Sequence, residues 1–264
     1  MESRAQNMQN NRNMEKLKLT EEWDKTFPKS DKVDHSKVTF VNRFGITLAA
    51  DLYVPKIAVA DKFPAIVVSG PFGAVKEQSS GLYAQTLAER GFLTIAFDPS
   101  FTGESSGQPR SVASPDINTE DFSAAVDYLA TRPDVDAERI GILGICGWGG
   151  FAINAAANDT RIKATVASTM YDISRANANG YFDAADNADA RYRIRRELNA
   201  QRTKDYRTGT YPCTTMNPEP AEDAPQFMKD YYDYYKTKRG YHSRSINSGL
   251  GWNQTSALAL INAP

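Results

Sequence analysis

The chain has 264 residues, of which 41% are hydrophobic, and its 31 basic and 32 acidic side chains give a formal net charge of -1 at pH 7. This length allows one large α/β domain or two small ones, with enough apolar residues for a buried core. The balanced charge gives no reason to expect nucleic acid or an anionic membrane as a partner. No stretch approaches the roughly 18 apolar residues of a spanning helix, so we expect no membrane contact.

Residues 1–30 are polar and contain no apolar segment typical of a signal peptide. The two cysteines, Cys146 and Cys213, lack the spacing of a metal site or of a disulfide framework, although one bridge between them stays open as an alternative. We therefore expect a soluble, cytoplasmic protein that needs no metal or organic cofactor. The sequence does not indicate its oligomeric state.

Residues 1–35 are predicted to form a loose, helix-prone N-terminal arm. The segment 37–53 alternates between apolar and polar side chains on either side of Asn42-Arg43-Phe44-Gly45, which predicts a β-hairpin. The apolar run 64–69 that follows is typical of a strand buried on both faces of a sheet.

Helices and strands then alternate as far as residue 172. Strands are predicted at 92–97, 140–145 and 162–169, and helices around Leu82 to Leu87, from Asn118 to the residues before Pro133, and from Phe151 onwards. Residues 36–172 are therefore predicted to be an α/β core with a mostly parallel, doubly wound sheet and helices on both faces. Such sheets bind ligands at the carboxyl ends of their strands. The loops at these ends are 70–73, 98–107, Cys146, and Tyr171-Asp172.

Residues 173–250 differ from the core in composition, because they hold nine of the 13 tyrosines and many arginines. A few helices joined by long loops are expected here. Inserted after a core strand, this segment is predicted to be a lid over the strand ends; the alternative is an amphipathic packing segment with solvated charges. Residues 251–264 are predicted to begin the C-terminal part of the core.

The run Gly144-Ile145-Cys146-Gly147-Trp148-Gly149 joins an apolar strand to a helix of small residues. A strand, a glycine-flanked turn and a helix are the parts of a nucleophile elbow, which exposes one side chain above the sheet. The N-terminus of the helix favours a thiolate there. Cys146 is therefore the candidate nucleophile, and the alternative is a small buried core cysteine.

An oxyanion hole requires two backbone N–H groups beside the nucleophile. The residue after it, Gly147, is predicted to supply one, and Phe72 in the loop after the first parallel strand is predicted to supply the other. Pro71 has no N–H to donate. The alternative is that Gly70-Pro71-Phe72-Gly73 is only a tight turn.

Four stretches, 69–73, 97–105, 144–150 and 241–245, carry a resemblance to the α/β-hydrolase superfamily that covers roughly residues 36–264. The chain is most similar to a branch of dienelactone-hydrolase-like and uncharacterised esterase- or peptidase-like proteins. This resemblance implies a hydrolase that acts on an ester, thioester, lactone or small amide. The aromatic residues of the predicted lid favour a small, partly apolar acyl substrate. The competing hypothesis is a non-catalytic protein of the same fold that binds a ligand, or an inactive fragment that lacks the catalytic base.

The chain departs from the pattern of the superfamily in two places. Trp148 stands where a glycine is usual, two residues after the nucleophile, and we expect it to crowd the contact between helix and strand unless Gly149 and Gly150 relieve it. The superfamily also continues past the lid with two strands whose loops carry the acid and the histidine. The chain is therefore expected to be truncated before these last strands, and its enzymatic activity depends on whether the full chain supplies that histidine.

The chain order Cys146, Asp172, His242 follows the order of nucleophile, acid and base in this fold. Asp172 and His242 are therefore candidates for the acid and base. Asp172 follows the strand after the elbow, and its alternative role is that of a helix N-cap or a surface carboxylate. His242 lies in the lid segment and not on a loop after a late strand, which argues against a role as the base. Asp98 is expected to brace its loop, and His35 to be an exposed loop residue.

Overall fold

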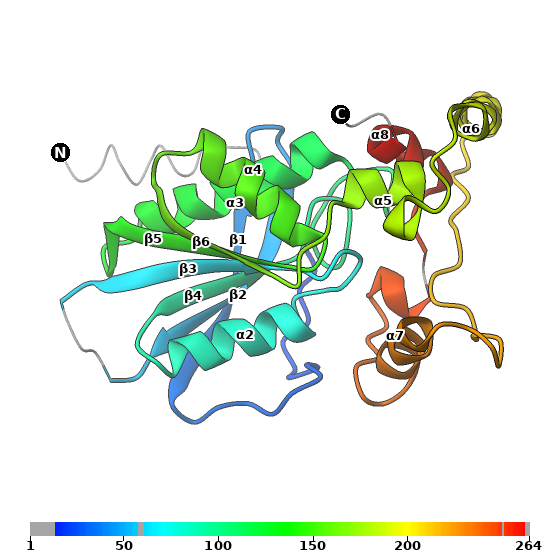
Figure 1. Cartoon of the computed structure of the whole chain (residues 1–264). Helices are drawn as coiled ribbons and strands as arrows, with labels where there is room; N and C mark the ends of the chain where they lie inside the picture. Colours follow the sequence, from blue (N-terminus) through cyan, green and yellow to red (C-terminus); the bar gives the residue numbers. More distant parts are fainter. Residues whose placement is uncertain (1–13, 58–60, 250, 262–264) are drawn as a thin grey trace.

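The computed structural model describes residues 14–57, 61–249 and 251–261. A six-stranded sheet with the order β1-β2-β4-β3-β5-β6 forms the centre of this part of the chain (Figure 1). Its strands are β1 (Val33–Val41), β2 (Thr47–Pro55), β3 (Phe63–Ser69), β4 (Leu93–Phe97), β5 (Val135–Ile145) and β6 (Ile162–Ser168).

The sheet has an antiparallel margin and a parallel centre. β1 and β2 form the predicted hairpin, and β2 also pairs antiparallel with β4. The strands β4, β3, β5 and β6 are all parallel, with Val67 of β3 opposite Ile95 of β4 and Ile142 of β5. These three side chains are fully buried, as expected for strands covered on both faces. The predicted fold class, a mostly parallel doubly wound α/β sheet, is confirmed.

Helices cover both faces of the sheet. α2 (Ser79–Ala88) lies on one face, and α3 (Pro115–Ala130) and α4 (Trp148–Asn158) lie on the other (Figure 1). The larger apolar core lies on the α3 and α4 face, and a smaller core lies under α2. The helix predicted from Asn118 begins three residues earlier than expected, at Pro115. Proline suits the first helical turn, and the Asn118 side chain accepts the N–H of Ser114 at 3.1 Å, which satisfies a donor at the helix start.

The segment after the core gathers beyond the carboxyl ends of the parallel strands (Figure 1). It contains α5 (Ile173–Asn179), η1 (Tyr181–Asp183), α6 (Ala188–Thr208), α7 (Gln226–Lys236), η2 (Ile246–Ser248), η3 (Gln254–Ser256) and α8 (Ala257–Ile261). The segment predicted as a lid, 173–250, therefore faces the strand ends.

The described part of the N-terminal arm, residues 14–32, contains no helix, so the expectation of helix is wrong for this part; residues 1–13 lie outside the described residues. Tertiary contacts decide its conformation. Trp23 packs edge-on against Phe27 and against His35 of β1, with ring centroids 5.7 Å and 5.1 Å apart. Asp24 binds the Arg244 guanidinium at 2.7 Å, which ties the arm to the far end of the chain.

A buried ammonium group links two loops of the core, the one after β3 and the one after β4. Lys76 is fully buried, and its Nζ lies 2.7 Å from a carboxylate oxygen of each of Glu77, Asp98 and Glu104. Burial lowers the pKa of Lys76, but these carboxylates reverse the effect and raise that pKa well above its ordinary value. Asp98 also accepts the backbone N–H groups of Lys76 and Glu104, both at 2.8 Å. Asp98 therefore braces its loop, as expected.

Replacing Lys76 by methionine leaves this carboxylate cluster without its ammonium partner. Because removal of one partner of a buried ion pair leaves an uncompensated charge, we expect Lys76→Met to lower the free energy of unfolding by about 3–5 kcal/mol. Urea denaturation measures this change. The matched control is Lys62→Met at an exposed lysine. Equal stabilities of the two variants would contradict the account.

The carboxyl group of Glu104 makes this cluster sensitive to acid. Burial raises its pKa, but the ammonium groups of Lys76 and Lys37 outweigh burial and lower the pKa to about 2, from an ordinary value of 4.5. The ionised group therefore stabilises the fold above pH 4.5, and this stabilisation disappears as the pH falls towards 2.

We expect the wild type to lose about 2–3 kcal/mol more stability than Glu104→Gln between pH 6 and pH 2.5. Thermal and urea unfolding across this range measure the difference. Glu138→Gln, at a side chain that is 84% exposed, should follow the wild type. Parallel stability curves for wild type and Glu104→Gln would show that Glu104 has no such role.

Candidate active site

Cys146 occupies the turn between β5 and α4. Its backbone φ is +59°, a left-handed conformation that costs a non-glycine residue about 1–2 kcal/mol. Two hydrogen bonds hold the turn: the Cys146 N–H donates to the Ser168 carbonyl at 2.9 Å, and the Cys146 carbonyl accepts the Gly149 N–H at 2.9 Å. The side chain is half-buried and lines a cavity. This geometry is that of a nucleophile elbow.

The glycines around Cys146 allow close packing of the turn. A Cβ atom on Gly144 would lie 2.3 Å from the Trp148 carbonyl oxygen, and one on Gly149 would lie 2.8 Å from the Met170 side chain. Trp148 itself is buried away from this contact, edge-on to Phe97 with ring centroids 5.6 Å apart. Trp148 therefore does not crowd the contact between helix and strand. Gly149 relieves it, as the sequence allowed, whereas a Cβ atom on Gly150 would meet nothing within 4 Å.

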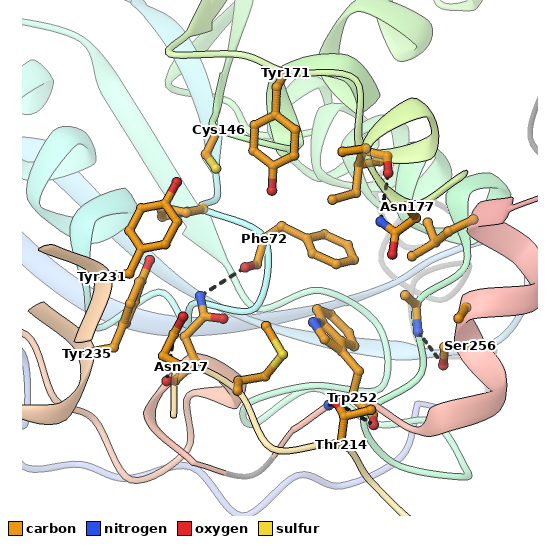
Figure 2. A pocket seen from close by; sticks show the side chains of 18 of the residues that line it. Phe72, Cys146, Tyr171, Asn177, Thr214, Asn217, Tyr231, Tyr235, Trp252 and Ser256 are labelled. Carbon is orange, nitrogen blue, oxygen red and sulfur yellow. Dashed lines mark hydrogen bonds between the residues drawn. The ribbon is translucent and has the colours of Figure 1, made fainter. Parts of the chain in front are cut away.

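The cavity beside Cys146 has a volume of about 710 Å³, within the range of small-molecule sites. Loops at the strand ends form one wall, with Phe72, Cys146 and Tyr171 directed towards a common space (Figure 2). The segment 173–250 and the residues after it form the opposite wall. Their lining side chains include Asn177, Tyr181, Thr214, Met216, Asn217, Tyr231, Tyr235, Asn247, Trp252 and Leu260.

Tyr171 is the polar side chain beside Cys146, and both side chains line the cavity (Figure 2). Burial, and after it the nearby Cys146, raise the pKa of the Tyr171 hydroxyl well above its ordinary value, so the hydroxyl keeps its proton at neutral pH. Tyr171 has no role among the residues predicted from the sequence, and its place in a loop at the end of a core strand is the only sequence signal for one.

Phe72 and Gly147, the predicted oxyanion donors, lie next to each other. A Cβ atom on Gly147 would lie 3.1 Å from the Phe72 Cβ atom. The Phe72 carbonyl accepts the Asn247 side-chain amide at 2.9 Å, and the Phe72 ring stacks on Trp252 with centroids 4.4 Å apart. The backbone N–H groups of Phe72 and Gly147 donate to no other described residue. Neither N–H group therefore has a hydrogen-bond partner in the described part of the chain.

Asp172 and His242 lie elsewhere, and neither lines the cavity. The Asp172 carboxylate caps α5, where it accepts the N–H groups of Ser174 and Arg175 at 2.9 Å. The His242 ring is buried, with Nε2 3.5 Å from a carboxylate oxygen of Asp24. The structure thus does not bring the candidate acid and base to Cys146, because each is engaged in a local structural contact.

His35 is part of β1 and not of a loop, so the expectation of an exposed loop residue is wrong. Its Nε2 lies 2.8 Å from a carboxylate oxygen of Asp51, and its ring packs between Trp23 and Tyr53. The hairpin predicted from residue 37 begins four residues earlier, at Val33, and the partner of His35 lies on the neighbouring strand β2.

The carboxylates of Glu77, Asp98 and Glu104 are close enough to hold a metal ion. The Lys76 ammonium already lies among them, and Lys37 and Arg244 bind the same cluster, so three cations balance the three carboxylates and the donor set does not fit a metal ion. In the described residues, no helix is both long and apolar enough to cross a membrane.

The parallel sheet, the elbow and the cavity at the strand ends define an α/β hydrolase. Residues 45–260 match the model of the family described as X-Pro dipeptidyl-peptidase (S15 family). The chain therefore belongs to this family.

Two bacterial relatives extend over most of the chain. The uncharacterized protein PA2218 of Pseudomonas aeruginosa is 60% identical over 248 residues, which cover 94% of this chain and 67% of that protein. Its crystal structure gives a TM-score of 0.92, covering 95% of this chain and 78% of the crystallised chain. The uncharacterized protein YcjY of Escherichia coli is 41% identical over 212 residues, covering 79% of this chain and 69% of that protein.

A fungal relative matches a shorter stretch. The thiohydrolase aneE of Aspergillus aculeatus is 35% identical over 129 residues, which cover 49% of this chain and 39% of that protein.

Removal of the Tyr171 hydroxyl tests its influence on Cys146. A hydroxyl beside the sulfur can donate to it as negative charge develops, so Tyr171→Phe should slow iodoacetamide labelling of Cys146 at pH 7 at least about threefold. Mass spectrometry of the labelled protein measures the rate. Tyr181→Phe, another cavity tyrosine, is the control. Equal labelling rates for Tyr171→Phe and Tyr181→Phe would refute the assignment.

Proposed function

We propose that the protein hydrolyses an ester, thioester, lactone or small amide with Cys146 as its nucleophile. The observation that carries this proposal is the left-handed backbone of Cys146 at the turn between β5 and α4, which directs the thiol into the cavity. The similarity to a protein named as a thiohydrolase favours an acyl thioester or ester within this set.

The proposed reaction begins with attack of the Cys146 thiolate on the acyl carbonyl carbon. The carbonyl π electrons move to oxygen, and the resulting oxyanion accepts the free N–H groups of Gly147 and Phe72. Each such donor is worth about 2.7–4 kcal/mol in the transition state. Collapse of the tetrahedral intermediate expels the leaving group and leaves an acyl thioester on Cys146, which water then hydrolyses.

Two features support a reactive thiolate. The N-terminus of α4 follows Cys146 directly, and its dipole favours negative charge on sulfur. The protonated Tyr171 hydroxyl lines the same cavity and is available to donate to the sulfur. Neither histidine of the chain lines the cavity, so the proposal assigns no imidazole base.

The competing hypothesis is a protein of this fold that binds a ligand without catalysis. The positions of His35 and His242 outside the cavity favour it, because loss of a catalytic base lowers the turnover of a hydrolase by up to about 10⁴–10⁶. The reactivity of the thiol distinguishes the two. An iodoacetamide-reactive Cys146 at pH 7 supports the enzyme, and an inert one supports the binding protein.

Replacement of the thiol is the direct kinetic test. We expect Cys146→Ala to lower kcat/KM for p-nitrophenyl hexanoate at least about 100-fold, since the covalent route is lost. Release of nitrophenolate, read by absorbance, measures the rate. Cys213→Ala is the matched control, because Cys213 is exposed and lies outside the cavity. If Cys146→Ala kept the wild-type rate, Cys146 would have no part in the mechanism.

A further inference from the structure

We infer, resting on the proposed function, that the acyl group of the substrate is uncharged and mainly apolar, and considerably larger than acetyl. Among the described residues, 24 line the cavity, and apart from the reactive thiol of Cys146 none of them carries an ionised side chain at neutral pH. An ionised group transferred into such a site without a partner loses its hydration with no compensating contact. The cavity therefore selects against an ammonium or carboxylate on the acyl chain.

The polar side chains of the cavity are largely engaged with the protein itself. The amide groups of Asn177, Asn217 and Asn247 donate to the carbonyl oxygens of Ile173, Asn247 and Phe72, at 2.7, 3.1 and 2.9 Å. These hydrogen bonds hold the amide side chains in place in the cavity wall. The amides are neutral, so they offer a ligand hydrogen bonds but no charge.

The charged residues next to the cavity are also engaged elsewhere. The Asp172 carboxylate caps α5, and the Arg175 guanidinium forms an ion pair with Asp183 outside the cavity. Neither Asp172 nor Arg175 is a lining residue, so neither offers a counter-charge to a ligand.

The apolar wall sets the size of the acyl group. Phe72 and Trp252 stack on each other, and Ile173 and Leu260 line the same cavity (Figure 2). An acetyl group leaves most of the 710 Å³ unfilled. Each methylene that enters an apolar site is worth about 0.8 kcal/mol, which corresponds to about fourfold in kcat/KM. A chain of six or seven carbons should therefore react about 100-fold or more faster than acetyl.

Two pairs of p-nitrophenyl esters that match in shape and differ in charge test the inference on the full-length protein. The 6-aminohexanoate ester is compared with the heptanoate ester, in which a methyl group replaces the ammonium. The adipate monoester is compared with the 6-methylheptanoate ester, in which an isopropyl group replaces the carboxylate. We expect kcat/KM to be at least about 100-fold lower for each charged ester, since an unpaired buried charge is opposed by several kcal/mol. Charged esters hydrolysed within about threefold of their neutral partners would overturn the inference and leave the proposed function standing.

A gain of charge in the cavity provides a complementary variant. Asn177→Asp places a carboxylate on the wall that Asn177 lines (Figure 2). It should raise the rate for the 6-aminohexanoate ester relative to the heptanoate ester at least about tenfold. Asn154→Asp, at an exposed position on α4, should leave this ratio unchanged. An unchanged ratio in a folded Asn177→Asp protein would count against the inference.

If no ester is hydrolysed, that result counts against the proposed function alone. A binding measurement then tests the inference about the acyl group. Heptanamide should slow iodoacetamide labelling of Cys146 by occupying the cavity, and 6-aminohexanamide at the same concentration should not. Equal protection by both amides would overturn the inference independently of catalysis.

Discussion

The left-handed backbone at Cys146 is the constraint on which the site depends. A non-glycine residue adopts a positive φ at a cost, and here Gly144 and Gly149 allow α4 to approach β5 and β6 closely enough to hold it. The same turn places the thiol at the N-terminus of α4. One local conformation thus positions the proposed nucleophile, the end of the helix and Gly147, one of the two proposed oxyanion donors.

The buried ion pairs of this molecule and its cavity lie in different places. Lys76 and its carboxylate partners connect the loops after β3 and β4, and Arg244 extends the network from Glu77 to the N-terminal arm. The described residues that line the cavity, in contrast, include no Asp, Glu, Lys, Arg or His. A buried network of ion pairs gains little net stability but penalises any arrangement that leaves one charge unpaired. It therefore fixes the loops that carry Phe72 without placing a charge near the substrate.

Much of the core could be predicted from the sequence, because its signals are local. Apolar runs bounded by glycine and proline give the strands and helices, and the glycine-flanked Cys146 gives the elbow. The contacts of His35, Tyr171 and His242 could not be predicted, because each partner lies on another element. Asp51 is on β2, Cys146 follows β5, and Asp24 is in the arm. The helix expected in residues 14–32 is absent because the packing of Trp23 and Phe27 outweighs the local helix propensity of this segment.

The most direct test of the central claim is to locate the acyl group during turnover. The full-length protein is mixed with p-nitrophenyl heptanoate, quenched in acid, digested with trypsin and mapped by mass spectrometry. The account predicts a heptanoyl group on the peptide that spans residues 140–161, bound to Cys146 and released by hydroxylamine as expected for a thioester. Turnover with no acylated Cys146, or with the acyl group on another residue, would contradict it.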